Sequence, residues 1–223
     1  MNRVPFSVYD FFGILASGFV LLAGTDFAFG GGWILREKMG FVLSLFWVLV
    51  AYVAGHVVAG LSGYLYEKKF VRGLLQLPEY TLFRDQGPGG WRRLFSAFYE
   101  PLPTRTRAKV LAKAHDRAGL SKPGRDMFFH CLPLVRREPL VLDRLNIFLN
   151  LYGFARNSSL AALLIVPVLV IGALTNEAEQ GVSAARLWAA AGALVAAVAL
   201  LYRYLKFFRL YAVEVFVNYA EGE

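Results

Sequence analysis

Apolar residues gather in four long runs along the chain, and polar or charged residues separate each run from the next. The clearest run covers residues 39–66 and contains no Lys, Arg, Asp or Glu over 28 positions. An α-helix rises about 1.5 Å per residue, so about 20 apolar residues cross the hydrocarbon core of a bilayer. This run therefore predicts a membrane-spanning helix.

Three further runs have the same character. Residues 157–176 form a 20-residue uncharged window, and residues 186–203 enclose 16 mostly small or aliphatic residues between two arginines that can extend to the membrane surface. The first run, residues 9–29, is the weakest, because Asp10 and Asp26 leave only 15 uncharged positions between them. Four such runs predict an all-α, polytopic membrane protein with four transmembrane helices.

Basic residues predict the orientation of these helices. The segment between the second and third runs holds 17 basic and eight acidic residues, Arg3 precedes the first run, and Arg203, Lys206 and Arg209 follow the fourth. Cytoplasmic loops of membrane proteins are enriched in Lys and Arg. We therefore expect a multi-pass protein of the cell inner membrane with both termini and the long segment in the cytoplasm, and with the short connections 31–40 and 177–185 outside.

The same runs divide the chain into four parts. Residues 1–66 and 157–203 are two transmembrane hairpins, residues 67–156 are a basic helical cytosolic domain inserted between the second and third helices, and residues 204–223 are a cytosolic C-terminal helix. The second helix meets no breaker before Pro78, and a helical pattern starting at Pro139 leads into the third. Both are expected to extend into the cytosol as rods.

Two details of the cytosolic parts can also be predicted. Thr104 is expected to cap a helix that ends at Gly119, because threonine favours N-caps and glycine favours the position after a helix. The C-terminal helix is rich in aromatic residues and too apolar to stand alone in water. It is expected to pack on the extension of the second helix or on another subunit.

Small residues recur at every fourth position of the second predicted span, at Ala51, Gly55, Ala59 and Gly63. In lipid, where apolar area gives little driving force between helices, such a stripe lets two helix backbones approach closely. The stripe serves either packing within one subunit or assembly of a homo-oligomer, and the sequence leaves both open.

His56 is the one ionisable residue in the middle of a predicted span. Intramembrane ionisable residues are candidates for function, and a small channel or proton-linked transporter centred on His56 is the alternative function. No second acid or base lies near it in the predicted spans, so a proton relay lacks an evident partner. A neutral histidine hydrogen-bonded to a neighbouring helix explains the residue equally well.

The basic residues of the inserted domain are candidates for binding an anion or a cytosolic protein partner. They are Arg92, Arg93, Arg105, Arg107, Lys109 and Lys113. Lipid headgroups, a nucleic acid or a nucleotide signal are the candidate anions, of which the nucleic acid and the nucleotide are not favoured. The enrichment of cytoplasmic loops in basic residues accounts for much of the same excess without any ligand.

Composition and motifs argue against catalysis and against a metal or other cofactor. The chain is 57% hydrophobic and only 18% charged, unlike a water-soluble domain, and its single cysteine cannot form an internal disulfide. His56, His115, His130 and Cys131 lack the spacing of zinc ligands, and the sequence contains no GxGxxG, P-loop, HExxH or GxSxG motif. We expect a non-enzymatic protein.

Four strings, YDFFGILASGFVLL, AYVAGHVVAGLSGYLYEKK, LNLYGFARNSS and KFFRLYAVEVF, resemble small four-span bacterial membrane subunits of antiviral (anti-phage) defence systems. The resemblance implies a membrane sensor or effector subunit that detects infection or answers a cytosolic partner, and then signals or forms a pore at the inner membrane. It assigns no residue a role. Together with the residue patterns, it leads us to expect an oligomeric subunit whose cytosolic domain receives a partner or ligand and couples it to the membrane helices.

Overall fold

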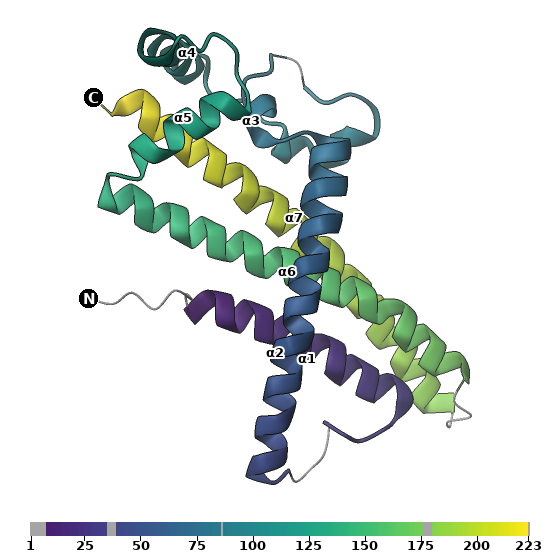
Figure 1. Ribbon diagram of the computed structural model, residues 1–223. Coiled ribbons are helices and arrows are strands. Elements are labelled where there is room, and N and C mark those ends of the chain that lie inside the picture. The colour runs from purple at the N-terminus through teal and green to yellow at the C-terminus, as the bar shows by residue number, and fades with distance from the viewer. Residues whose placement is uncertain (1–7, 35–38, 86, 176–179, 223) are drawn as a thin grey trace. The chain divides into compact units, whose positions relative to one another are not determined.

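The computed structural model describes residues 8–34, 39–85, 87–175 and 180–222, and these residues are helical with no strand among them (Figure 1). Arg3, and the charged residues of the two short connections, lie outside this range. The helices are α1 (Val8–Phe29), α2 (Phe41–Ser62), the π-helix η1 (Gly63–Leu75), α3 (Pro78–Thr81), the 3₁₀-helix η2 (Gly90–Phe98), α4 (Thr104–Ala118), α5 (Arg125–Val135), α6 (Pro139–Thr175) and α7 (Gln180–Glu221).

Among the described residues, three helical stretches are long and apolar enough to cross a membrane: Phe41–Thr81, Pro139–Thr175 and Gly181–Glu221. In α1 the apolar stretch is shorter and covers Gly13–Phe29. The described chain is thus all-α and has the character of a multi-pass membrane protein, whereas the fourth span and the cytosolic insertion stay predictions. The expected helix extensions are confirmed, because α2 runs directly into η1 and α6 is one unbroken helix.

The chain forms two compact units. Unit 1 comprises Met1–Tyr66 and Gly153–Arg203, and unit 2 comprises Glu67–Tyr152 and Tyr204–Glu223. Helices α6 and α7 each contribute one part to unit 1 and the other part to unit 2.

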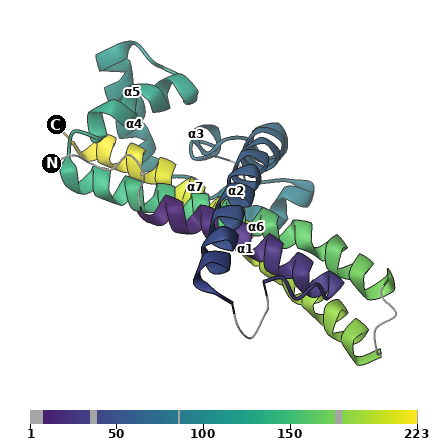
Figure 2. The ribbon, with the colours of Figure 1, turned by 60° about the horizontal axis from the view of Figure 1, so that its bottom comes forward.

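Helix α1 contacts α2, α6 and α7 within unit 1, although it was the weakest of the four predicted spans. A Cβ atom built on Gly18 would overlap the backbone of Ala51 in α2, and one built on Gly55 would overlap the carbonyl of Ile14 in α1. The two backbones therefore touch at this crossing. Figures 1 and 2 both show α2 crossing α1 rather than running beside it.

Glycines also set the packing of α1 on α6. A Cβ on Gly24 would overlap the side chain of Ile165, and one on Gly172 would overlap the carbonyl of Ala28. Residues 24 and 28 of α1 thus contact residues 165 and 172 of α6, so the contacts follow the same order along both helices. Helix α1 and the part of α6 that belongs to unit 1 therefore run parallel.

A buried arginine joins α7 to the ends of these two helices. Arg186 is only 3% exposed, and it donates hydrogen bonds to the carbonyls of Phe27 in α1 (3.3 Å) and Gly172 in α6 (3.1 Å). Carbonyls in the last turn of a helix lack an intrahelical partner and carry partial negative charge. Arg186 therefore does not extend to the membrane surface as its sequence position suggests, but satisfies carbonyls inside unit 1.

A row of polar side chains connects α2, α6 and α7 within unit 1. Ser62 donates to Oδ1 of Asn157 (2.7 Å), and Ser159 donates to the carbonyl of Ala197 (2.7 Å). Because the Ser159 proton is used in this way, the Tyr66 hydroxyl donates to Ser159 Oγ (3.1 Å). Interhelical hydrogen bonds of this kind stabilise helix association where water is absent.

Unit 2 has its own apolar core, to which the last turns of α7 contribute directly. The core residues are Leu82, Leu102, Val110, Ala114, Met127, Phe128, Cys131, Val135, Val141, Leu145, Ala212, Val215, Phe216 and Tyr219. The C-terminal helix was expected to pack on the extension of the second helix or on another subunit. In the structure it shares one core with α4, α5 and the first turns of α6, which explains its high apolar content. Packing on another subunit stays a prediction.

Two local features of unit 2 complete the fold. The expected cap of α4 is wrong, because the helix begins at Thr104 itself, with Pro103 in the N-cap position and no side-chain cap. Its end at Gly119 is confirmed, since that glycine adopts the left-handed conformation with φ of 68°. Where α6 and α7 enter unit 2, the rings of Tyr152 and Tyr204 lie 6.1 Å apart.

The crossing of α1 and α2 predicts a difference between two glycines of the same helix. Gly55→Ala should lower the thermal unfolding midpoint in detergent, because the new methyl group meets the Ile14 carbonyl, and overpacking costs about 1–3 kcal/mol. Gly60→Ala is the matched control, since nothing lies within 4 Å of the added Cβ. Equal midpoints for the two variants would contradict the backbone contact.

Candidate functional site

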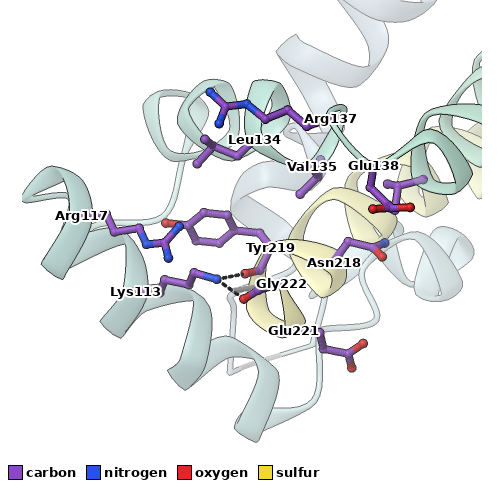
Figure 3. Close-up of a pocket in the computed structure, with 11 residues that line it drawn as sticks. Lys113, Arg117, Leu134, Val135, Arg137, Glu138, Asn218, Tyr219, Glu221 and Gly222 are labelled. Carbon is purple, nitrogen blue, oxygen red and sulfur yellow. Dashed lines mark hydrogen bonds between the residues drawn. The ribbon is translucent and has the colours of Figure 1, made fainter.

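The end of α7 forms one wall of a pocket in unit 2 with a volume of about 460 Å³ (Figure 3). Helix α4 supplies Lys113 and Arg117, and the end of α5 supplies an apolar floor. The full lining is Lys113, Arg117, Leu134, Val135, Arg137, Glu138, Val141, Asn218, Tyr219, Glu221 and Gly222. Ligand-binding pockets commonly have volumes of about 300–1,000 Å³ and combine an apolar lining with a few polar groups, as this one does.

Lys113 holds the C-terminal end of α7 at the pocket. Its Nζ donates to the carbonyl of Tyr219 (3.0 Å) and to that of Gly222, and it lies 5.1 Å from the centre of the Tyr219 ring. These carbonyls are at the negative end of the helix dipole, where a cation is stabilising. Burial, reinforced by the nearby Arg117, lowers the pKa of Lys113. Lys113 therefore belongs to the pocket lining and also binds the C-terminal end of α7 directly.

Two buried polar atoms beside the pocket have no hydrogen-bond partner among the residues that the structure describes. They are the hydroxyl of Tyr219 and Nε2 of His130, whose rings meet edge to face with centroids 5.9 Å apart. Figure 3 shows the hydroxyl end of Tyr219 directed toward the side of the pocket that carries Arg117. Buried polar groups are nearly always paired, so these two atoms are suited to a ligand that supplies a hydrogen bond.

The charged side chains of the pocket suit a ligand with negative charge. Three bases, Lys113, Arg117 and Arg137, face two acids, Glu138 and Glu221, so the lining carries a net positive charge. Arg117, Arg137 and both acids are exposed at the rim, where they remain accessible to a partner. An anionic small molecule or an acidic segment of a protein matches this arrangement.

The cysteine beneath the pocket is held as a neutral thiol. Cys131 is fully buried, and this burial raises the pKa of its thiol to about 12. A cysteine acts as a nucleophile or metal ligand only as the thiolate. In the described part of the chain, no three His, Cys, Asp or Glu side chains are close enough together to hold a metal ion.

The structure does not bring the six predicted anion-binding residues together. Lys113 alone among them lines the pocket. Arg107 has a structural role, because it pairs with Asp85 (2.6 Å) and donates to the carbonyls of Phe83 and Arg84. The other four lie elsewhere on unit 2: Arg92 and Arg93 in η2, and Arg105 and Lys109 on the exposed side of α4.

The predicted residues of the second span have separate positions. Ala51 and Gly55 are buried against α1, Ala59 is half-buried, and Gly63 lies near Arg156. This contact is within one chain, and assembly of several chains through the stripe stays a prediction.

His56 is exposed on α2, where its ring meets that of Tyr52 edge to face at 4.6 Å. Among the described residues, the His56 side chain has no hydrogen-bond partner. A transport role for His56 stays a prediction.

Sequence reasoning did not identify Tyr219, Asn218 and Arg137 as site residues. Tyr219 belongs to the C-terminal helix, whose high apolar content makes it unstable alone in water. That content is the one sequence signal that the helix belongs to a core.

Comparison with protein-family models, with curated proteins and with solved structures finds no match.

The neutral thiol predicts slow chemical modification of Cys131. A rise in pKa from 9.0 to about 12 lowers the thiolate fraction near neutral pH about a thousandfold. A thiol reagent should therefore label the folded protein in detergent very slowly and label it fully once it is unfolded in sodium dodecyl sulfate. Rapid labelling of the folded protein would contradict the buried position.

The same shift predicts how stability depends on pH. Because the folded state keeps the Cys131 proton up to a higher pH than the unfolded state, its contribution to stability is present below pH 9 and declines as the pH rises toward 12. The lowered pKa of Lys113 has the opposite effect on stability. Lys113 holds its proton more weakly in the folded state than in the unfolded state, so its contribution to stability increases as the pH rises. Cys131→Ala should remove the thiol-dependent decline in the unfolding midpoint between pH 9 and 12.

Proposed function

We propose that the chain is a non-enzymatic inner-membrane sensor or effector subunit with four membrane spans. In this proposal unit 2 faces the cytoplasm, receives an anionic ligand or an acidic protein partner in the pocket at the end of α7, and transmits binding to the membrane helices. The observation that carries the proposal is the continuity of α7. One unbroken helix holds a long apolar segment within residues 181–203 and the pocket residues Asn218 and Tyr219.

The contacts at both ends of α7 support coupling along it. At one end Arg186 binds carbonyls of α1 and α6, and at the other end Lys113 binds the last carbonyls of α7. A helix fixed at both ends transmits a displacement or rotation better than a chain with a loop between its ends. A ligand that changes the position of Lys113 or Tyr219 therefore acts on the helix that Arg186 joins to its neighbours.

The surface of α2 supports placement in lipid and suggests assembly. In the first half of this helix Phe41 and Val42 are 83% and 80% exposed, and Leu45, Phe46 and Leu49 are also exposed. So much exposed apolar surface on one helix is stable against lipid or another protein. We include a homo-oligomer in the proposal, and we include a role in antiviral defence on the basis of the sequence resemblance alone.

The order of α1 and α6 supports the proposed topology. These helices run parallel, so the start of α1 and residue 154 lie on the same side of unit 1. The apolar stretch of α1, 17 residues long, spans about 26 Å, a mismatch with the bilayer core that local thinning can accommodate. Both hairpins then begin in the cytoplasm, in agreement with the many basic residues between them.

Reporter fusions test this topology. Fusions after Gly32 and Gln180 should report from the outer side of the membrane, and a fusion after Gln86 should report from the cytoplasm. Alkaline washing should leave the chain in the membrane fraction. An outward Gln86 fusion, or release by the wash, would refute the proposed placement.

Coupling can be tested without knowing the ligand, by filling the pocket with a side chain. In a Cys131→Ala background, an environment-sensitive dye is attached at Val195→Cys, an exposed position in the apolar half of α7. Asn218→Trp should shift the dye emission, because the indole occupies the pocket. Lys122→Trp, an exposed substitution outside the pocket, is the matched control and should cause no shift.

A second change checks that the signal travels through the helix. Two glycines inserted after Arg203 should abolish the shift caused by Asn218→Trp, because glycine weakens a helix. Circular dichroism would show whether each variant is folded. Identical emission from folded Asn218→Trp and Lys122→Trp proteins would reject transmission along α7.

A further inference from the structure

Unit 2 contains a second hollow, which we term the arginine pocket. Its volume is about 500 Å³, and it lies where η1 ends and where α3 and α5 begin. Its lining residues are Arg72, Gln76, Leu77, Tyr80, Arg84 and Arg125. Three separate segments of the chain thus each place one guanidinium group at the same hollow.

The arginines of this pocket are available to a ligand. Within the described parts of the chain, the side chains of Arg72 and Arg84 have no hydrogen bond or ion pair, and Arg125 has only the ring of Phe129, 5.4 Å away. Glu79 is half-buried nearby and interacts electrostatically with Arg125 and Arg72. Three arginines and one glutamate give the site a net charge of +2.

The backbone of the pocket is strained at Gln76. This residue has a φ of 77°, the one positive φ among the non-glycine residues that the structure describes. This conformation is unfavourable for a residue with a side chain, and such strain is common at ligand sites. The backbone N–H of Gln76 donates to the carbonyl of Val71 (2.7 Å), whereas its side-chain carboxamide has no hydrogen-bond partner among the described residues and can bind a ligand.

Gly124 allows Tyr80 to form another wall. A Cβ atom at position 124 would lie 2.9 Å from the Tyr80 ring, and the φ of 155° at this glycine also disfavours a side chain. The ring of Tyr80 therefore packs directly on the backbone that precedes α5. The pocket thus combines three guanidinium groups with a carboxamide and a phenol ring in one lining.

We propose that the arginine pocket binds a phosphate group that carries two negative charges. Guanidinium groups bind phosphate oxygens through paired, charge-assisted hydrogen bonds, and a dianion balances the net charge of the site. The phosphate is carried either by a lipid headgroup or by a soluble molecule. Arg72 follows Tyr66, the last residue of the uncharged run, by six positions on one continuous helix, which makes a lipid headgroup the first source to examine.

The test measures binding to the purified full chain in detergent by the shift in its unfolding midpoint. The lipid probes are phosphatidic acid, which carries a phosphomonoester, and phosphatidylglycerol, which carries a diester; the soluble probe is inorganic pyrophosphate. We expect phosphatidic acid or pyrophosphate to stabilise the protein more than phosphatidylglycerol does. Stabilisation by phosphatidic acid alone identifies a lipid source, and stabilisation by pyrophosphate alone identifies a soluble one.

Three substitutions in the pocket and one control outside it assign this binding. Arg84→Gln and Arg125→Gln should each weaken the apparent affinity about tenfold or more, whereas Lys122→Gln, which removes the same charge from an exposed position outside the pocket, should leave it unchanged. Gln76→Gly should raise the unfolding midpoint without ligand, because it relieves the backbone strain. It should also weaken phosphate binding, because it removes the side-chain carboxamide.

Two results would overturn the proposal. One is equal binding by Arg84→Gln, Arg125→Gln and Lys122→Gln. The other is the absence of any preference for phosphatidic acid or pyrophosphate over phosphatidylglycerol in the wild-type protein. The Arg84 side chain has no hydrogen bond or ion pair to lose among the described residues, so its variant remains informative even if Arg125→Gln unfolds.

Discussion

Direct contact between helix backbones at glycine is the constraint on which unit 1 depends. Gly18 and Gly55 bring α1 and α2 together, and Gly24 and Gly172 bring α1 and α6 together. In a lipid environment the hydrophobic effect does not hold helices together, so close packing and polar contacts must do so. These contacts also bring the end of α1 near α6, where one guanidinium group, that of Arg186, can reach carbonyls of both helices.

The sequence predicted the helices well because hydropathy and helix breakers are local properties. The continuity of α6 from Pro139 and the end of α4 at Gly119 were both read from short patterns. The contacts of α1 with three other helices were not, since its composition resembles a marginal span. The burial of Arg186 was also missed, because an arginine at the edge of an apolar run looks the same whether it faces water or a neighbouring helix.

The candidate site was only partly visible in the sequence for a similar reason. Lys113 was one of many basic residues, and its partner Tyr219 lies 106 positions away. Arg107 appeared equally suited to an anion, but Asp85 and two carbonyls already engage it. Sequence reveals the supply of charges, whereas the pairing that leaves some of them available depends on which helices share a core.

The core of unit 2 is drawn from two stretches of sequence, with the α6–α7 hairpin of unit 1 inserted between them. Residues 67–152 alone would leave uncovered the apolar side chains that Phe216 and Val215 contact. The rings of Tyr152 and Tyr204 are, however, 6.1 Å apart, so the two points where the hairpin departs and returns are close neighbours. In a chain that begins at residue 67, a short linker joining these positions would omit residues 153–203 and give a miniature version of unit 2 for crystallisation and ligand screening.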